Sequence, residues 1–145
     1  MIETVNNEVE EKIQEILKGN NAIMLATTGA DYSPWILGAY FVNKGLDIYL
    51  LVESGGKSFA NIKENKNVAY SISQNDATKD FLQGKAAIEI LPAEEEEKVR
   101  AMLVEKMPWY QTFVPMTPIK IVSSKIFVTS LQSGWFPAKV LENMN

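Results

Sequence analysis

A lysine and a serine follow two glycines at a point where an apolar run gives way to a polar segment. The segment ESGGKS covers residues 53–58 within IYLLVESGGKSFANIKEN, residues 48–65. The first amides of a helix have no intrahelical acceptors, so a helix N-terminus binds anions, and Lys57 and Ser58 would add a positive charge and a hydroxyl donor. This pattern is typical of a phosphate-binding corner, although two glycines before a helix are more often only a turn.

The letters GKS also occur in the phosphate-binding loop of nucleotide hydrolases. That loop requires a glycine five residues before the glycine of GKS, and this position holds Leu51 inside the apolar run. Such hydrolases also need alternating parallel strands and helices and a strand-end aspartate for magnesium, and the sequence offers neither. We therefore exclude that class.

The composition excludes most of the catalytic chemistry that side chains alone can perform. The 145 residues include no cysteine and no histidine, which excludes disulfides, thiolate nucleophiles, a Ser-His-Asp relay and a histidine-ligated haem. The net charge is -4 and Arg100 is the single arginine, so a nucleic-acid partner is not expected. An enzyme built on this chain would take its chemistry from a cofactor, or from carboxylates, lysine, tyrosine or serine alone.

Hydrophobic periodicity predicts one domain, residues 1–145, of mainly β structure with flanking helices. Short connections favour antiparallel pairing, and we expect a small six-stranded antiparallel barrel with helices on its outside. The predicted strands are residues 22–28, 34–42, 46–53, 67–74, 81–91 and 119–131. The predicted helices are residues 4–18, 57–65 and 93–107.

Three smaller features accompany these elements. Gly84 lies within a long predicted strand, where it indicates a bulge or a close backbone approach. The four glutamates at residues 94–97 favour a solvated helix start over a metal site. Residues 108–118, PWYQTFVPMTP, are aromatic and proline-rich, which predicts a loop packed on a surface.

Three segments, in this order, resemble the FMN-binding split-barrel superfamily, which includes pyridoxamine 5'-phosphate oxidase and small FMN-binding proteins. IMLATTGADYSPWILGAYFV resembles its opening hairpin, LLVESGGKSFANIKENKNVAYSI its phosphate-binding segment, and FLQGKAAIEIL its following glycine-containing strand. The resemblance covers roughly residues 22–91, with a looser match over the last strand. It implies a six-stranded antiparallel split barrel of Greek-key type, an FMN cofactor and a homodimer with FMN at the subunit interface.

The resemblance also assigns site residues. It implies that Lys57 and Ser58 bind the FMN phosphate with help from Ser54. The ring and ribityl chain would lie along the strand residues Gly38, Ala39, Tyr40, Val52 and Glu53. The partner subunit would contribute Gln83 and Trp135. Without the resemblance, Gly38 and Ala39 are better explained as part of a packed inner strand, and Trp135 fits a core position equally well.

The implied function is that of a flavoprotein oxidoreductase that uses bound FMN to transfer hydride or electrons to an unidentified small molecule. Two alternatives stay open, a flavin-binding or electron-transfer module without turnover and a deazaflavin-dependent reductase. Oxidases of vitamin B6 phosphates use several arginines, and with Arg100 alone we do not expect that substrate. The acidic, amphipathic N-terminus lacks the pattern of a secretory signal, so we expect a cytoplasmic protein without a membrane or nucleic-acid partner.

Overall fold

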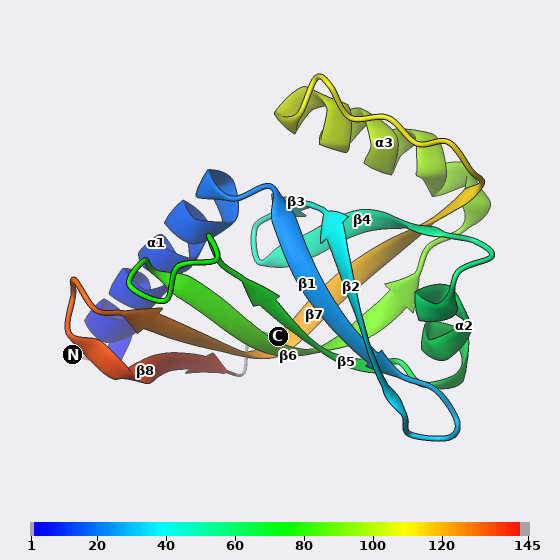
Figure 1. Cartoon of the computed structure of the whole chain (residues 1–145). Coiled ribbons are helices and arrows are strands. Elements are labelled where there is room, and N and C mark those ends of the chain that lie inside the picture. Colours follow the sequence, from blue (N-terminus) through cyan, green and yellow to red (C-terminus); the bar gives the residue numbers. More distant parts are fainter. Residues whose placement is uncertain (1, 143–145) are drawn as a thin grey trace.

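A curled antiparallel sheet with helices on its outside makes up the chain (Figure 1). This computed structural model describes residues 2–142, with side chains described from residue 7 onward. The helices are α1 (Ile2–Gly19), α2 (Lys57–Glu64) and α3 (Glu96–Lys106), the last preceded by a 3-10 turn over Ala93–Glu95. The strands are β1 (Ala22–Thr28), β2 (Pro34–Tyr40), β3 (Val42–Lys44), β4 (Asp47–Glu53), β5 (Asn67–Ile72), β6 (Phe81–Ile90), β7 (Met116–Ser130) and β8 (Trp135–Glu142).

The order of the strands explains why the sheet curls. Hydrogen-bonded neighbours run β2-β1-β5-β6-β7-β4-β3, and β8 pairs with the second half of β7. The two ends of this path, β2 and β3, are consecutive in the chain with only Phe41 between them. The sheet must therefore bend until its ends approach each other, and it leaves a seam where β2 faces β4 without backbone pairing.

The expected split-barrel class is confirmed, but the expected number of strands was too low. Residues 34–42 form β2 and β3, because the wholly buried Phe41 divides them and donates its amide to the Asn21 carbonyl (3.0 Å). Residues 135–142, which lie outside the strands predicted from sequence, form β8. Pro137 hides that strand in the sequence, since proline lacks the amide that a ladder uses and is found mainly on edge strands.

Helices α1 and α3 cover separate parts of the barrel. Of the expected apolar positions of α1, Val9, Ile13, Ile16 and Leu17 are buried in the main core, whereas Val5 lies outside the residues whose side chains are described. Helix α3 buries Val99, Leu103 and the adjoining Met107 against Val42 and Leu51, in a smaller core on β3 and β4. No helix of the described chain is long and apolar enough to cross a bilayer.

Lys106 joins the ends of these two helices. Its ammonium donates to the carbonyls of Leu17, Asn20 and Phe41 at 3.2, 2.6 and 3.3 Å, and it lies 3.9 Å from the centre of the Phe41 ring. Burial lowers the pKa of Lys106 to about 8. The lysine thus fixes α3 against the C-terminal end of α1.

The close backbone approach predicted at Gly84 is present. A Cβ at this position would lie 2.1 Å from Cζ of Tyr70, which sits directly opposite on β5. The Tyr70 hydroxyl shares a hydrogen bond of 2.8 Å with the Ser123 hydroxyl, and the pairing of β6 with β7 shifts register between Lys85 and Ala86. Of the two alternatives predicted for Gly84, the close approach is the one present at this residue, and the register shift lies just beyond it.

Candidate functional site

The seam of the barrel holds a cavity of about 280 Å³. One wall comes from β2 and β4, through residues 37–40 and 51–53, and the other from the segment that follows α3, through residues 110–114 and 116. Five residues expected at a flavin site from sequence therefore line one cavity. They are Gly38, Ala39, Tyr40, Val52 and Glu53.

The seam also leaves part of a strand edge free. Strand β3 pairs with β4 only at Asp47, Ile48 and Tyr49, and β7 occupies the opposite edge of β4. Over the described chain, residues 50–53 of β4 have no strand partner on the side of β2. Free strand edges present amide donors and carbonyl acceptors, so the cavity can hydrogen-bond a flat polar ring through the main chain.

The cavity adjoins the N-terminus of α2. Glu53 lines the cavity and is followed after three residues by Lys57, the first residue of α2. Gly56 occupies the N-cap, and no side-chain cap bonds to the first turn. Two amides of the preceding loop are already paired, because Ser54 donates to the Pro115 carbonyl (2.9 Å) and Gly56 to the Glu53 carbonyl (3.0 Å). The first turn of α2 has no side-chain cap, and an uncapped helix N-terminus of this kind can accept an anion.

Ser54, Lys57 and Ser58 differ in what they contact. The Ser54 hydroxyl shares a 2.8 Å hydrogen bond with the Thr117 hydroxyl of β7. Lys57 is exposed, and its charge helps to lower the pKa of Asp31, which is lowered mainly by the hydrogen bond from the Ser33 amide. Ser58 is 5% exposed, and its buried hydroxyl oxygen has no hydrogen-bond partner among the described residues.

Two asparagines, one buried and one partly buried, fix the position of α2. The Asn61 amide donates to the Thr27 hydroxyl (3.0 Å) and the Asn65 amide to the Thr28 hydroxyl (2.8 Å), which ties one side of the helix to β1. A Cβ at Gly29 would lie 2.7 Å from the Asn61 side-chain oxygen, so the turn after β1 must approach α2 closely. These contacts explain the asparagine-rich end of α2 and hold its first turn beside the cavity.

Residues 110–114, in the segment that follows α3, form the wall that sequence analysis did not foresee. Arg100 binds Glu96 on its own helix and donates to the Thr112 hydroxyl of this segment at 2.8 Å. The Tyr40 ring meets the rings of Trp109 and Tyr110 edge-on, with centroids 4.8 and 6.2 Å apart. Burial raises the pKa of Tyr110.

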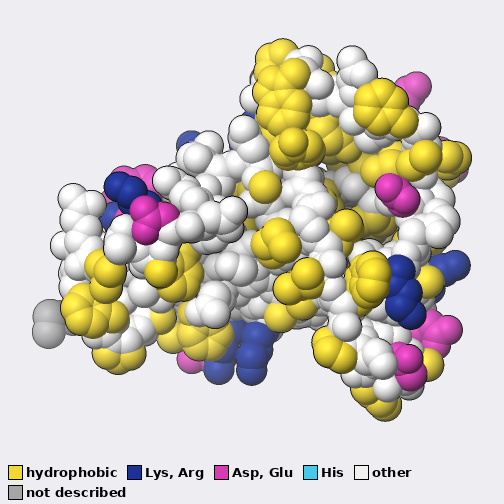
Figure 2. All heavy atoms as spheres, viewed as in Figure 1, with side chains coloured by type: hydrophobic (Ala, Val, Ile, Leu, Met, Phe, Trp, Pro, Cys, Tyr) yellow, Lys and Arg dark blue, Asp and Glu magenta, His cyan; other side chains and the backbone are white. Residues whose placement is uncertain are grey.

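The expectation that these aromatic side chains pack on a surface was only half right. Trp109 and Phe113 are 54% and 87% exposed, and Figure 2 shows apolar side chains gathered over α3 and the segment that follows it. The usable signal in the sequence was the density of aromatic residues. It indicated an ordered segment without indicating which cavity it borders.

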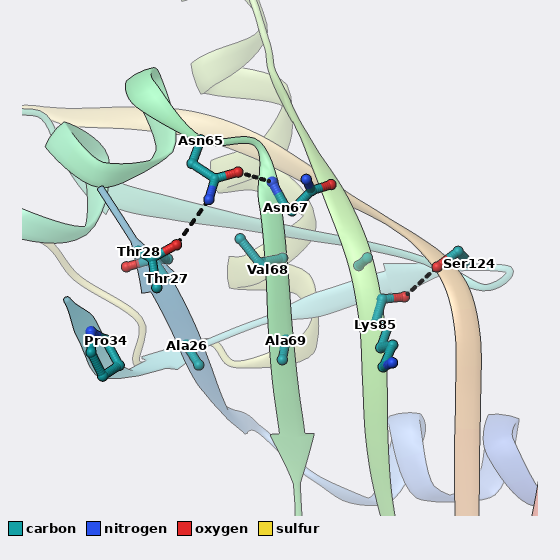
Figure 3. A pocket seen from close by; sticks show the side chains of 11 residues that line it. Ala26, Thr27, Thr28, Pro34, Asn65, Asn67, Val68, Ala69, Lys85 and Ser124 are labelled. Atoms are coloured by element: carbon teal, nitrogen blue, oxygen red, sulfur yellow. Dashed lines mark hydrogen bonds between the residues drawn. The ribbon is translucent and has the colours of Figure 1, made fainter. Parts of the chain in front are cut away.

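A second hollow, of about 490 Å³, lies on the outer face of β1, β5 and β6 (Figure 3). Small side chains line it, among them Ala26, Pro34 and Ala69. Its polar groups already bind one another, since the Asn65 side chain bridges Thr28 and the Asn67 amide and the Ser124 hydroxyl donates to the Lys85 carbonyl (3.1 Å). It is a shallow face of small residues and lacks the helix terminus that the seam cavity adjoins.

Comparison with known proteins places the chain in a family. The sequence model of the family described as pyridoxamine 5'-phosphate oxidase matches residues 9–127. The chain belongs to this family. A search of curated protein sequences found no match.

Solved structures agree with the pyridoxamine 5'-phosphate oxidase fold. Campylobacter jejuni ChuZ is 18% identical with a TM-score of 0.78, covering 96% of this chain and 61% of its own. HutZ, the heme storage protein of Vibrio cholerae, is 18% identical with a TM-score of 0.69, covering 85% and 97%. A structure described as F420 reductase is 20% identical with a TM-score of 0.66, covering 78% and 94%. At these identities the likeness shows the fold alone.

Two residues that the resemblance to this family assigned to the site lie outside the cavity of a single chain. Gln83 is exposed on β6, between Ser71 of β5 and Phe127 of β7. Trp135 begins β8, packs partly against the main core and lies under Lys139, whose Nζ is 4.4 Å from the centre of the ring. Figure 1 places β8 at the end of the sheet away from α2. Their assignment to a partner's site stays a prediction.

Proposed function

We propose that this member of the pyridoxamine 5'-phosphate oxidase family is a flavoprotein that binds FMN, with the phosphate at the N-terminus of α2 and the ring in the seam cavity. The carrying observation is the unpartnered hydroxyl of Ser58 in the first turn of α2. A buried hydroxyl without a partner costs about 1–3 kcal/mol, so such groups are rare unless a ligand completes them. With the Ser58 side chain turned toward the uncapped start of α2, a phosphate oxygen would supply the missing partner.

The charge and the hydrogen-bond donors at the start of α2 fit a phosphorylated flavin. Lys57 is exposed at the uncapped helix start, where positive charge and amide donors act together on a dianion. Ser54, tied to Thr117 and Pro115, would fix the loop beneath that phosphate. These donors can hold the phosphate of FMN without an arginine.

The ring of FMN suits the walls of the seam cavity. Gly38 has no side chain, so a flat ring can approach the backbone of β2 there, and an added Cβ would also lie only 3.3 Å from the Met24 sulfur. Ala39 is equally small, and Val52 and Glu53 flank the free edge of β4. These residues would orient the ring, while Tyr40 with Trp109 and Tyr110 would keep water from one side of it.

FMN, when bound, supplies hydride and electron transfer that this chain's own side chains do not. The proposed activity is therefore that of an oxidoreductase acting on an unidentified small molecule. A flavin-binding module without turnover is the alternative. Histidine, the common haem ligand, is missing from the sequence, which favours flavin over the heme that the name of HutZ indicates for that protein.

The exposed face of the sheet supports assembly as a homodimer. Met24 and Ile36 are 43% and 62% exposed and flank the small Ala26, opposite which Ala69 lies on β5. Figure 2 shows few charged side chains over the middle of this face. An apolar, low face of this kind is typical of a subunit interface, and a partner packed on it would bring its own Gln83 and Trp135 toward the seam.

The visible spectrum of the purified protein, with and without added FMN, tests the cofactor assignment. We expect the bands of protein-bound oxidised flavin, and their loss in Lys57→Ala, which removes the charge from the start of α2. Lys63→Ala is the matched control, because it removes the same charge from an exposed position in the last turn of the same helix. Equal flavin occupancy in both variants would contradict the proposed phosphate site.

Two further observations separate the alternatives. A deazaflavin such as F420 absorbs in one band at shorter wavelength than FMN, so the spectrum itself identifies it. Anaerobic mixing of the FMN-loaded protein with NADH or NADPH then separates an enzyme from a module. Rapid bleaching of the flavin supports the enzyme, whereas a persistent yellow colour supports a flavin module.

A further inference from the structure

The charges around the seam cavity limit the substrate of the proposed flavoprotein, and this limit depends on the proposed function. Among the described residues that line the cavity, Glu53 is the single residue with a charged side chain, and no lysine or arginine lines it. An anion that enters such a cavity loses hydration without gaining a counter-charge, and Glu53 would repel it further. Lys57 stands outside this lining, at the start of α2.

Arg100 contacts the wall through Thr112, but its charge is already neutralised. Its guanidinium forms an ion pair with Glu96, and its remaining described bond goes to the Thr112 hydroxyl. Neither Arg100 nor Glu96 lines the cavity. The arginine therefore acts as a clamp on the wall and does not provide a receptor for phosphate or carboxylate.

The wall itself is apolar and aromatic. Tyr40 and Tyr110 line the cavity and meet edge-on, and Phe113 stands at its rim with 87% of its surface exposed. A large apolar side chain left in solvent beside a cavity gains contact area when a flat apolar molecule enters. Both the missing counter-charge and the aromatic rim favour the same class of molecule.

We infer that the substrate entering against the wall of residues 110–114 is an uncharged planar aromatic molecule, and that phosphorylated and carboxylated molecules are excluded. This substrate class differs from the phosphorylated compound in the name of the family. The inferred exclusion follows from the residues of the wall, so one added charge in the wall should reverse it.

A matched pair of probes tests the inference. Naphthoquinone and its monosulfonate share one planar ring system and differ by one negative charge. Binding of each is measured by quenching of tryptophan fluorescence, with Trp109→Phe as the check that the signal comes from this wall. We expect the uncharged quinone to bind at least about tenfold more tightly than the sulfonate, because the wall offers the sulfonate no partner.

Substitutions at Val114 make the comparison specific. Val114 lines the cavity and is 48% exposed, so it tolerates a longer side chain. Val114→Arg should bring the two affinities within about threefold or invert them, whereas the uncharged Val114→Gln should keep the wild-type ratio. Equal binding of both probes to the wild type, failure of the uncharged quinone to bind, or the same ratio in both variants would overturn the inference.

The fluorescence readout does not need the flavin. A protein that fails to hold FMN is recognised from its visible spectrum and refutes the proposed function. The quinone pair is then still compared on the same sample, and the selectivity of the cavity is decided separately.

Discussion

Replacing Ser58 with alanine should have opposite effects on the free and the FMN-bound protein. The hydroxyl is buried without a partner, so the free protein carries its desolvation cost, about 1–3 kcal/mol. The higher helix propensity of alanine adds about 0.5 kcal/mol in the same direction. We expect the free energy of unfolding of the flavin-free protein to rise by about 1–2 kcal/mol, which corresponds to roughly 3–6 °C in melting temperature.

The same substitution should weaken FMN binding. A hydrogen bond to a charged phosphate contributes about 1.5–3 kcal/mol, so the dissociation constant should rise roughly tenfold to hundredfold. Thermal unfolding of the flavin-free protein and a flavin fluorescence titration measure the two effects. The stabilisation that saturating FMN adds to the melting temperature should shrink in the variant.

Ser130 provides the control for a buried serine whose hydroxyl is satisfied. It is wholly buried, and its hydroxyl accepts the Ser133 amide at 3.1 Å. Ser130→Ala should therefore lower the free energy of unfolding by about 1 kcal/mol. If Ser58→Ala destabilised the flavin-free protein as Ser130→Ala does, the Ser58 hydroxyl would have a partner within the protein, and the reasoning for the phosphate site would be wrong.

Three further predictions concern the barrel and its outer face. Gly84→Ala should lower the free energy of unfolding by about 3 kcal/mol in denaturant titrations, because its Cβ would lie 2.1 Å from the Tyr70 ring, whereas Gly19→Ala, with nothing within 4 Å, should be nearly neutral. The folded-state pKa of Lys106, about 8, is below its unfolded value, so the unfolded chain binds more protons above pH 8 and stability should rise with pH. Partial exposure reduces this gain to about 1 kcal/mol, spread between pH 8 and the unfolded pKa of about 10.5, and Lys106→Met should lack it. Ala69→Arg should convert the proposed dimer to a monomer in light-scattering measurements of molar mass, since it places a charge on the exposed face.

The fold could be predicted from sequence because local pattern and connectivity agreed. Short connections between alternating strands left antiparallel pairing as the simple solution, and Gly84 marked the close approach to Tyr70. Strand β8 was missed because Pro137 breaks the alternation that identifies a strand, while pairing with the second half of β7 still holds it in the sheet. Tertiary pairing overrode a local signal there.

The candidate site was predictable only on the side formed by the sheet and α2. Gly38 and Val52 are 14 residues apart in sequence, and their meeting depends on the closure of the barrel, which the order of strands implies. The opposite wall depends on Arg100 reaching Thr112, a contact between two ordinary polar residues that no spacing rule identifies. Helical periodicity assigns Arg100 to a polar helix face, and its role as a clamp needed coordinates.

The free edge of β4 has a consequence for how this protein responds to mutation. Peptide groups at residues 50–53 remain whatever side chains are attached, so alanine scanning of this strand would leave its donors and acceptors intact. Proline, which removes an amide hydrogen, is the substitution that addresses them. When a ligand is bound through peptide groups, the identity of the side chains matters little. Sequences can therefore diverge widely around such an edge and keep the same hydrogen-bond donors and acceptors.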